Sequence, residues 1–282
     1  MSIFALALLV VFSAAGAWLG EWVAGLKLSR GLPVCLGALA LVAARAMTAH
    51  VPGVEDAFYL WDHYPYFKAA IFAPPALLVL AFLARRVPRR PLRVLLGLFA
   101  VVVFSQAALY SLHFVWAEHW YSALSGTVDE TGYCPQTSPY TCGAASAAML
   151  LHSAGINTTE AEMARECLVR AGIGVTDNTL ARGIRRKTEG TPWRIKVIKN
   201  LRYDQLRELP KPALISLRQS WLLQHIVVVE WTEDRRVGIA DPQTGRTVMP
   251  REQFERSWVG DALTLVRAKG PNDAKRGETL HF

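Results

Sequence analysis

A cysteine at the beginning of a predicted helix is the residue of this sequence best placed for covalent chemistry. Cys142 follows Pro139, which favours a turn, and precedes Gly143-Ala-Ala, which permits close approach of the backbone. A thiol attacks a carbonyl as the thiolate, and its ordinary pKa of about 8.5 leaves little thiolate at neutral pH. Because unpaired N–H groups at a helix N-terminus stabilise the anion, this placement favours a reactive nucleophile.

Further residues supply the other groups that a thiol nucleophile needs. His225 begins an apolar stretch and is a candidate general base, which takes the thiol proton and later protonates the leaving amine. Asp241 lies sixteen residues later, before Pro242, and is a candidate for the carboxylate that orients the imidazole. Gln136 lies six residues before Cys142, where its amide and the Cys142 N–H are expected to hold the oxyanion. Taken singly, these residues also fit a core histidine, a turn aspartate and a loop glutamine, so only the combination favours catalysis.

The combination resembles the papain-like cysteine peptidases that process bacteriocins and other peptides with a double-glycine leader. The resemblance extends over residues 125 to 268, roughly half of the chain. The matching segments are Gln136 to Leu151, His225 with the valines after it, Asp241-Pro242, Phe254 to Trp258, and Ala262-Leu-Thr-Leu. The resemblance implies that the nucleophile, base, orienting acid and oxyanion donor are Cys142, His225, Asp241 and Gln136, respectively.

Two features depart from the members of that family best known for leader processing. Those proteins carry the peptidase at the N-terminus of an ABC transporter, in the cytoplasm, whereas here the matching segment follows an apolar N-terminal half. No Walker motif, Gly-x4-Gly-Lys-Ser/Thr, occurs in the sequence, so no nucleotide is expected as a partner. The expected partner is a peptide or protein substrate, with a glycine-rich leader or propeptide among the candidates.

Metal catalysis and serine hydrolysis have no support in the sequence. There is no His-x3-His or paired Cys-x2-Cys spacing and no Gly-x-Ser-x-Gly motif, so neither a metal nor a cofactor is expected. The formal net charge of the whole chain is +8. The second half mixes acidic and basic residues without a basic stripe, which disfavours nucleic acid as a partner. Whether Cys134 and Cys167 form a disulfide stays open.

The first 118 residues are predicted to be an all-α transmembrane domain of four helices. Apolar runs near the ~20 residues that cross a bilayer occupy about residues 3–24, 32–49, 67–84 and 94–116. No relay of Asp, Glu or His lies within these runs, so the sequence favours an anchor over a transporter or channel. The expected partners of this half are the lipid bilayer and any membrane protein that the helices bind.

The loop charges predict on which side of the membrane the peptidase lies. The segment from His50 to Tyr66 contains acidic residues and no Lys or Arg. Basic residues gather instead in the loops after the first and third helices, namely Lys27, Arg30, Arg85, Arg86, Arg89, Arg90 and Arg93. The positive-inside rule therefore places those loops in the cytoplasm and the peptidase on the periplasmic or extracellular side of a bacterial plasma membrane. Arg45, near the outer end of the second helix, is the exception.

Residues 119–268 are predicted to form an α+β domain, in which helices precede an antiparallel sheet. Helices are expected over Cys142–Ser153 with Gly155 as its stop, from a Thr159/Glu162 capping box through Val169, from Thr176 or Asp177 to Lys187, and over Arg251–Ser257. Strands are expected over Trp193–Ile198, Ala213–Leu217, Ile226–Trp231, Val237–Ala240 and Ala262–Val266. The loops Gly172 to Asn178 and Arg218 to Leu222, with Trp221, are expected to border a substrate groove, and residues 269–282 read as a polar tail.

The favoured interpretation is a membrane-anchored cysteine endopeptidase with a Cys-His-Asp triad and a Gln oxyanion donor. One alternative is a catalytically silent receptor or scaffold that holds a leader-like peptide in the membrane. A second alternative is an amidase or transpeptidase that uses the same thiolate. Because every expected catalytic residue is present, the sequence favours an enzyme over the receptor; only products separate the enzymatic alternatives.

Overall fold

The computed structural model describes residues 2–48, 64–220 and 223–268. The chain divides into two compact units, Met1–Glu118 and His119–Phe282. Three predicted features lie outside the described residues. They are the acidic part of the segment after the second helix, Trp221 with Leu222, and the tail 269–282.

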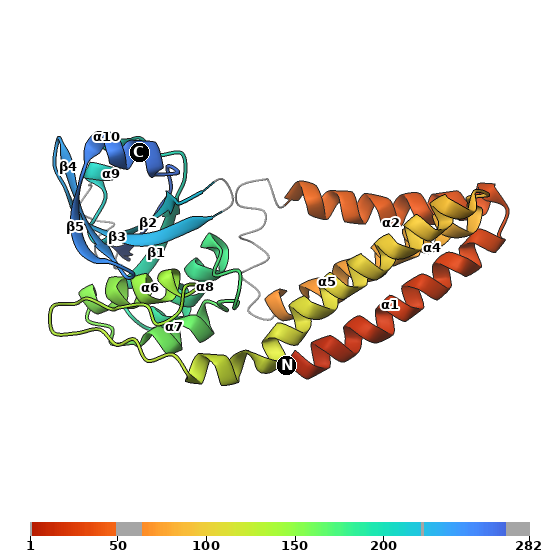
Figure 1. Cartoon of the computed structure of the whole chain (residues 1–282), viewed down its shortest axis with the longest axis horizontal. Coiled ribbons are helices and arrows are strands. Elements are labelled where there is room, and N and C mark those ends of the chain that lie inside the picture. Colours follow the sequence, from red (N-terminus) through yellow and green to blue (C-terminus); the bar gives the residue numbers. More distant parts are fainter. Residues whose placement is uncertain (1, 49–63, 221–222, 269–282) are drawn as a thin grey trace. The chain divides into compact units, whose positions relative to one another are not determined.

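The first unit is built from long helices (Figure 1). They are α1 (Ser2–Gly25), α2 (Leu28–Thr48), α4 (Tyr64–Arg86) and α5 (Arg90–Ser122). Among the described residues, α1, α4 and α5 are long and apolar enough to cross a membrane, whereas the apolar part of α2, Leu28–Ala44, is shorter. The structure therefore supplies three candidate spans, and the fourth stays a prediction.

Small residues bring α1 close to α4. A Cβ added at Gly16 would lie 2.5 Å from the carbonyl oxygen of Pro74, and one at Gly20 would overlap the carbonyl of Leu78. Small residues four apart are a common means of close helix packing in membranes. The α1–α2 loop also lies beside the end of α4, because the Arg86 guanidinium donates to the carbonyl of Leu26 (Figure 1). The two basic loops are thus at the same end of this unit.

The second unit has the predicted α+β order. Its first helices are α6 (Cys142–Ser153), α7 (Glu160–Glu166) and α8 (Asp177–Lys187). A six-stranded antiparallel sheet of order β1-β6-β2-β3-β4-β5 follows. The strands are β1 (Trp193–Ile198), β2 (Ala213–Arg218), β3 (Gln224–Thr232), β4 (Arg236–Asp241), β5 (Gly245–Pro250) and β6 (Ala262–Arg267), with α9 (Tyr203–Glu208) and α10 (Arg251–Ser257) between them.

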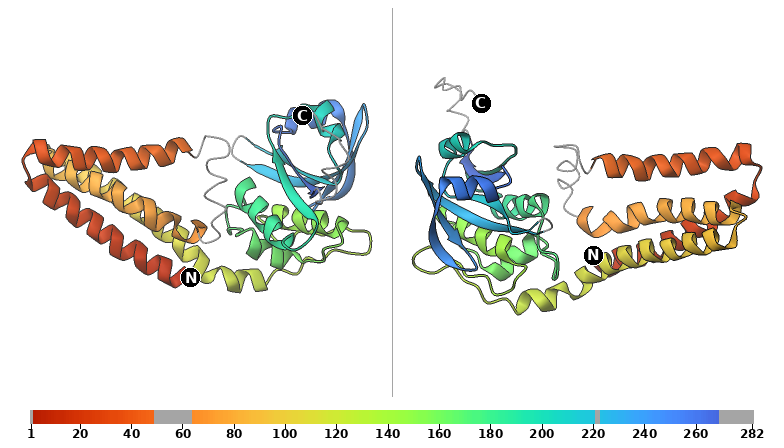
Figure 2. Two further views of the ribbon diagram at one scale, coloured as in Figure 1. Left: turned by 180° about the vertical axis from the view of Figure 1, so that it is seen from behind. Right: turned by 45° about the horizontal axis from the view of Figure 1, so that its top comes forward.

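Helices cover both faces of the central strands. The α6 helix packs against β2 and β3, with α7 and α8 beside it, and the α9 and α10 helices lie across the sheet from them in Figures 1 and 2. Tyr203 and Leu206 of α9 and Phe254 of α10 share one core with Val227 and Ile239 of the sheet. Burial on both faces explains why the central strands are continuous apolar runs rather than alternating ones.

Some elements differ from the sequence predictions. The α7 helix ends at Glu166 rather than at Val169, because Leu168 adopts a left-handed backbone with a φ of 53°. Strand β5 and the short helix α9 were not predicted. Most residues of β5 are exposed at the edge of the sheet, so burial imposes no alternating pattern on its sequence.

The caps of α7 and α8 match the sequence predictions only in part. Thr159 caps α7 by accepting from the N–H of Glu162, but the Glu162 carboxylate accepts from Thr158 and Lys187. Only half of the predicted capping box therefore forms. At α8 the cap is Thr176, one of the two predicted candidates, and it exchanges reciprocal hydrogen bonds with the third residue of the helix.

Candidate active site

The thiol of Cys142 lies at the first residue of α6, on the wall of a cavity. The residue is 8% exposed. Thr141 precedes the helix but makes no side-chain cap, since its hydroxyl donates to the carbonyl of Ser138 at 2.8 Å. The N–H groups of the first turn are thus available to stabilise a thiolate, as the sequence predicts.

Glycine is required directly after Cys142. A Cβ at position 143 would overlap a methyl group of Val175 and lie 3.1 Å from the Cδ1 of Ile226. Gly143 therefore lets the loop before α8 pack against the start of α6. This contact places one wall of the cavity beside the thiol.

Antiparallel pairing brings His225 next to Asp241. His225 is near the start of β3, and Asp241 is the last residue of β4. The register pairs Val228 with Ala240, so the two side chains meet at the same end of the strand pair. The Nε2 of His225 lies 2.7 Å from the Oδ1 of Asp241.

Cys142 and His225 both line the cavity, and the Cys142 side chain is among the groups that raise the pKa of the His225 imidazole. Because Nε2 is engaged by Asp241, the nitrogen left for the thiol is Nδ1. Burial acts to lower the pKa of His225, but the interactions with Asp241 and Cys142 outweigh it and raise this pKa to about 9. The arrangement thus favours a protonated imidazole beside the Asp241 carboxylate at neutral pH.

The Asp241 carboxylate is held by the turn that follows β4. Its Oδ1 accepts from the N–H of Gln243 at 2.8 Å, and its Oδ2 accepts from the hydroxyl of Thr244 at 2.9 Å. Burial acts to raise the pKa of Asp241, but the hydrogen bonds from His225 and Gln243 lower it below its ordinary value. The group is therefore ionised and fixed in orientation.

The fourth predicted residue, Gln136, lies beside this turn. Its backbone N–H donates to the carbonyl of Pro242 at 2.9 Å, and its side-chain Nε2 donates to the carbonyl of Ser138 at 3.1 Å. The residue is half-buried and is not part of the cavity wall. The structure thus brings Cys142, His225 and Asp241 together, while the role of the Gln136 amide in an oxyanion hole stays a prediction.

The cavity beside the thiol has a volume of about 500 Å³. One predicted groove loop forms much of its wall, since residues 172–177 all line it. From the second predicted loop, Gln219 lines the cavity, and Leu223 and Gln224 line it just beyond that loop. Ile173 and Leu223 are exposed apolar side chains on this wall.

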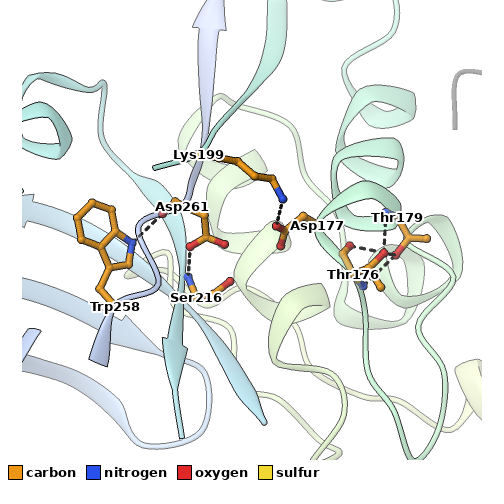
Figure 3. Close-up of polar contacts among 7 residues, drawn as sticks. All are labelled: Thr176, Asp177, Thr179, Lys199, Ser216, Trp258 and Asp261. Atoms are coloured by element: carbon orange, nitrogen blue, oxygen red, sulfur yellow. Dashed lines mark hydrogen bonds and ion pairs between the residues drawn. The ribbon is translucent and has the colours of Figure 1, made fainter. Parts of the chain in front are cut away.

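A polar network supports one end of the cavity (Figure 3). Asp177 and Ser216 line the cavity. Lys199 pairs with Asp177 at 2.8 Å, and the carboxylate of Asp261 accepts from the N–H of Ser216 at 3.1 Å. The indole of Trp258 donates to the carbonyl of Asp261 at 2.8 Å. Burial, together with the charge of Asp177, raises the pKa of Asp261. Asp261 and Ser216 carried no recognisable sequence signal, because neither belongs to a spaced motif.

The remaining cysteines of this unit are not paired. Cys134 and Cys167 are both free thiols and fully buried, which answers the question that their spacing left open. Burial raises the pKa of Cys134 to about 12 and raises the pKa of Cys167 well above its ordinary value. Among the described residues, no group of His, Cys, Asp and Glu is suited to hold a metal ion.

Comparison with known proteins adds sequence relatives of the second unit. The sequence model of the Peptidase C39 family matches residues 130–270. An uncharacterized protein of Methanothermobacter thermautotrophicus is 30% identical over 132 residues, which cover 47% of this chain and 86% of that protein. The transport/processing ATP-binding protein ComA of Streptococcus pneumoniae is 32% identical over 143 residues, which cover 50% of this chain. The matched part is 19% of ComA, so this chain spans about a fifth of that protein.

A solved structure with a similar segment is that of a double glycine motif protease from an AMS/PCAT transporter, in complex with the leader peptide. It shares 23% sequence identity with this chain. The aligned part covers 48% of this chain and 91% of that one, with a TM-score of 0.42.

Proposed function

Because the chain belongs to the peptidase C39 family, we propose that it is a membrane-anchored cysteine endopeptidase that hydrolyses a peptide bond near the bilayer. The observation that carries this proposal is the position of His225. Its Nε2 lies 2.7 Å from Asp241, and its ring lines the same cavity as the Cys142 thiol, which helps to raise the His225 pKa. This is the arrangement of nucleophile, base and orienting group that thiol peptidases require.

In the first step the thiol proton of Cys142 resides on Nδ1 of His225, and the thiolate attacks the carbonyl carbon of the scissile bond. The carbonyl oxygen becomes an oxyanion, which the Cys142 N–H and the Gln136 amide stabilise. The imidazolium then gives its proton to the leaving nitrogen, and the C–N bond breaks. The products of this step are a free amine and a thioester on Cys142.

In the second step water hydrolyses the thioester. His225, now neutral, takes a proton from the water, and the hydroxide adds to the thioester carbonyl. Collapse of this adduct expels the thiolate of Cys142 and releases a carboxylic acid. Asp241 keeps Nε2–H in place throughout, so the ring presents Nδ1 to the sulfur in both steps.

The substrate class that we propose is a peptide or propeptide with glycine at the cleavage site. Gly172 and Gly174 lie on the cavity wall, where small residues leave room for a peptide backbone. The relative ComA, a transport/processing ATP-binding protein, supports a processing reaction. The whole of ComA is much longer, so its transport activity is not part of this proposal.

A silent peptide receptor is the less favoured alternative. A receptor needs a groove but no ionised carboxylate fixed against a histidine, and here hydrogen bonds from the turn after β4 fix Asp241 in that position. An amidase or transpeptidase would use the same three side chains. The products identify the reaction: an amidase releases a carboxylic acid, whereas a transpeptidase joins the acyl group to a second amine.

The proposal is tested with the full chain in detergent and a quenched fluorogenic peptide that carries a Gly-Gly cleavage site. Cys142→Ala is expected to abolish hydrolysis while the circular dichroism spectrum stays unchanged. Cys167→Ala removes another buried thiol of the same unit, outside the cavity, and is the matched control. Hydrolysis that survives in Cys142→Ala contradicts the proposal.

For the membrane half, we propose that its helices anchor the peptidase to the outer side of a plasma membrane. The hydrogen bond from Arg86 to Leu26 supports this topology, because it holds the two basic loops at the same end of the first unit. With those loops in the cytoplasm, α5 crosses the bilayer once more before the peptidase begins. Proteinase K added to sealed spheroplasts is then expected to degrade the peptidase unit. If proteinase K degrades the peptidase unit only after the spheroplasts are lysed, the unit lies inside the cell.

A further inference from the structure

Glu160, the first residue of α7, carries a buried carboxylate that the steps above do not use. The residue is 0% exposed. We propose that Glu160 is a positioning residue, which holds the loop of Gln136 so that the amide can serve as oxyanion donor. This inference rests on the proposed function, because it concerns the assembly of that same site.

The Glu160 carboxylate joins two segments that are distant in the sequence. Its Oε1 accepts from the N–H of Thr137 at 2.8 Å, and its Oε2 accepts from the Thr137 hydroxyl at 2.6 Å. Oε2 also accepts from the N–H of Gly126 at 3.0 Å. In the described part of the chain no Lys or Arg forms an ion pair with it. Neutral donors alone thus satisfy this buried acid, which makes its hydrogen-bond geometry decisive.

The backbone around Gly126 adds to this contact. The N–H of Glu160 donates to the carbonyl of Gly126 at 2.9 Å, and Thr127 forms a β-bridge with Thr159. A Cβ at position 126 would lie 2.6 Å from Oε2 of Glu160, so the close approach requires glycine. The segment that follows α5 is therefore a fixed support for the carboxylate.

The effect on the proposed oxyanion donor follows from the chain order. Thr137 directly follows Gln136, whose own N–H is bound to the carbonyl of Pro242 at 2.9 Å. Gln136 is thus held on one side by the turn that carries Asp241 and on the other side by Glu160. Loss of the contact between Thr137 and Glu160 would remove one of these two attachments and let the Gln136 amide move.

An amide at position 160 cannot make all of these contacts. The N–H groups of Thr137 and Gly126 bind different carboxylate oxygens, Oε1 and Oε2. The side chain of Glu160→Gln has a single oxygen, so in either orientation one backbone N–H faces the NH₂ group and loses its acceptor. Glu160→Gln is therefore nearly isosteric but necessarily breaks the link between the two segments.

The test compares two reactions of the same thiol in the full chain in detergent. Hydrolysis of the Gly-Gly peptide needs the oxyanion donor, whereas alkylation of Cys142 by iodoacetamide forms no oxyanion. Glu160→Gln is expected to lower kcat about 10- to 100-fold, which is less than the effect of deleting an oxyanion donor outright. KM is expected to change less than about threefold. The alkylation rate of Cys142 is expected to stay within about twofold of wild type, because the His225 contact is intact.

Glu162→Gln is the matched control. Glu162 lies in the same helix, but its carboxylate contacts Thr158 and Lys187 rather than the loop of Gln136. This variant is expected to keep wild-type kcat and KM. Thr137→Val provides a second variant, since it removes only the hydroxyl contact and should lower kcat by less than Glu160→Gln does.

Other outcomes contradict the inference. Wild-type kcat in both Glu160→Gln and Thr137→Val overturns it, and so does a parallel loss of hydrolysis and alkylation, which would indicate a purely structural role. If Glu160→Gln does not fold, the kcat of Thr137→Val decides. A wild-type chain that cuts no glycine-containing peptide contradicts the proposed function itself, and this failure is distinguishable because it occurs before any substitution at position 160.

Discussion

Replacing Asp241 with Asn or with Ala separates the charge of this residue from its geometry. In Asp241→Asn the amide oxygen can still accept from Nε2 of His225 and from the N–H of Gln243, as Oδ1 does. The new NH₂ group can donate to the hydroxyl oxygen of Thr244, which lies 2.9 Å from Oδ2. Asp241→Asn therefore preserves every contact of the turn and removes only the negative charge, whereas Asp241→Ala removes both.

The magnitude follows from the pKa of His225. Its ordinary value of 6.5 is raised to about 9, against the effect of burial, by the interactions with Asp241 and Cys142. Because a raised pKa keeps the imidazolium present up to about pH 9, kcat/KM should fall as the pH rises through that value. Loss of the Asp241 charge should move this alkaline limb down by about one unit, which corresponds to about 1.4 kcal/mol.

The assay is kcat/KM for the Gly-Gly peptide as a function of pH. We expect Asp241→Asn to retain activity within about tenfold at neutral pH, with the shifted limb, and Asp241→Ala to lose about 100-fold or more. Asp234→Asn removes an exposed carboxylate that pairs with Arg207 and should leave the profile unchanged. An alkaline limb that stays in place in Asp241→Asn would refute the coupling of this charge to His225. Equal losses in Asn and Ala variants would refute the role of the hydrogen bond.

Other predictions concern the thiols and the packing at the start of α6. Iodoacetamide at neutral pH should label Cys142 in preference to Cys134 and Cys167, whose pKa values are raised by burial; peptide mapping that finds equal labelling would contradict this. Gly143→Ala should lower the free energy of unfolding by about 1–3 kcal/mol, because the added methyl group overlaps Val175. Urea denaturation measures this loss, and an unchanged midpoint would show that the loop of Val175 moves freely. Val175→Ala should restore part of the stability in the double variant.

The sequence was sufficient to predict which candidate side chains come together, because each of them stands in a recognisable local pattern. Cys142 is recognisable from the turn and glycine around it, and the structure confirms that it opens a helix. His225 and Asp241 meet because two short strands pair antiparallel, and the sequence predicted both strands. The orientation of the Gln136 amide is harder to predict, since it depends on contacts with Ser138 and Pro242 that no local pattern encodes.

The supporting residues could not be predicted, because their roles arise only in the folded chain. The Thr159/Glu162 pair suggested an ordinary helix start, and nothing in the sequence distinguishes the buried carboxylate of Glu160 from the partly exposed one of Glu162. The early end of α7 depends on a leucine, Leu168, in a left-handed conformation that sequence reasoning assigns to glycine. Burial on both faces made β2 and β3 easy to recognise, whereas exposure at the edge concealed β5.

The central claim is that Cys142 becomes acylated during peptide hydrolysis. The direct measurement is intact mass spectrometry of the full chain, quenched in acid during turnover of the Gly-Gly peptide, followed by peptide mapping. The account predicts an adduct with the mass of the N-terminal product less one water, located on Cys142 and absent from Cys142→Ala. Turnover without any adduct, together with wild-type hydrolysis by Cys142→Ala, would contradict it.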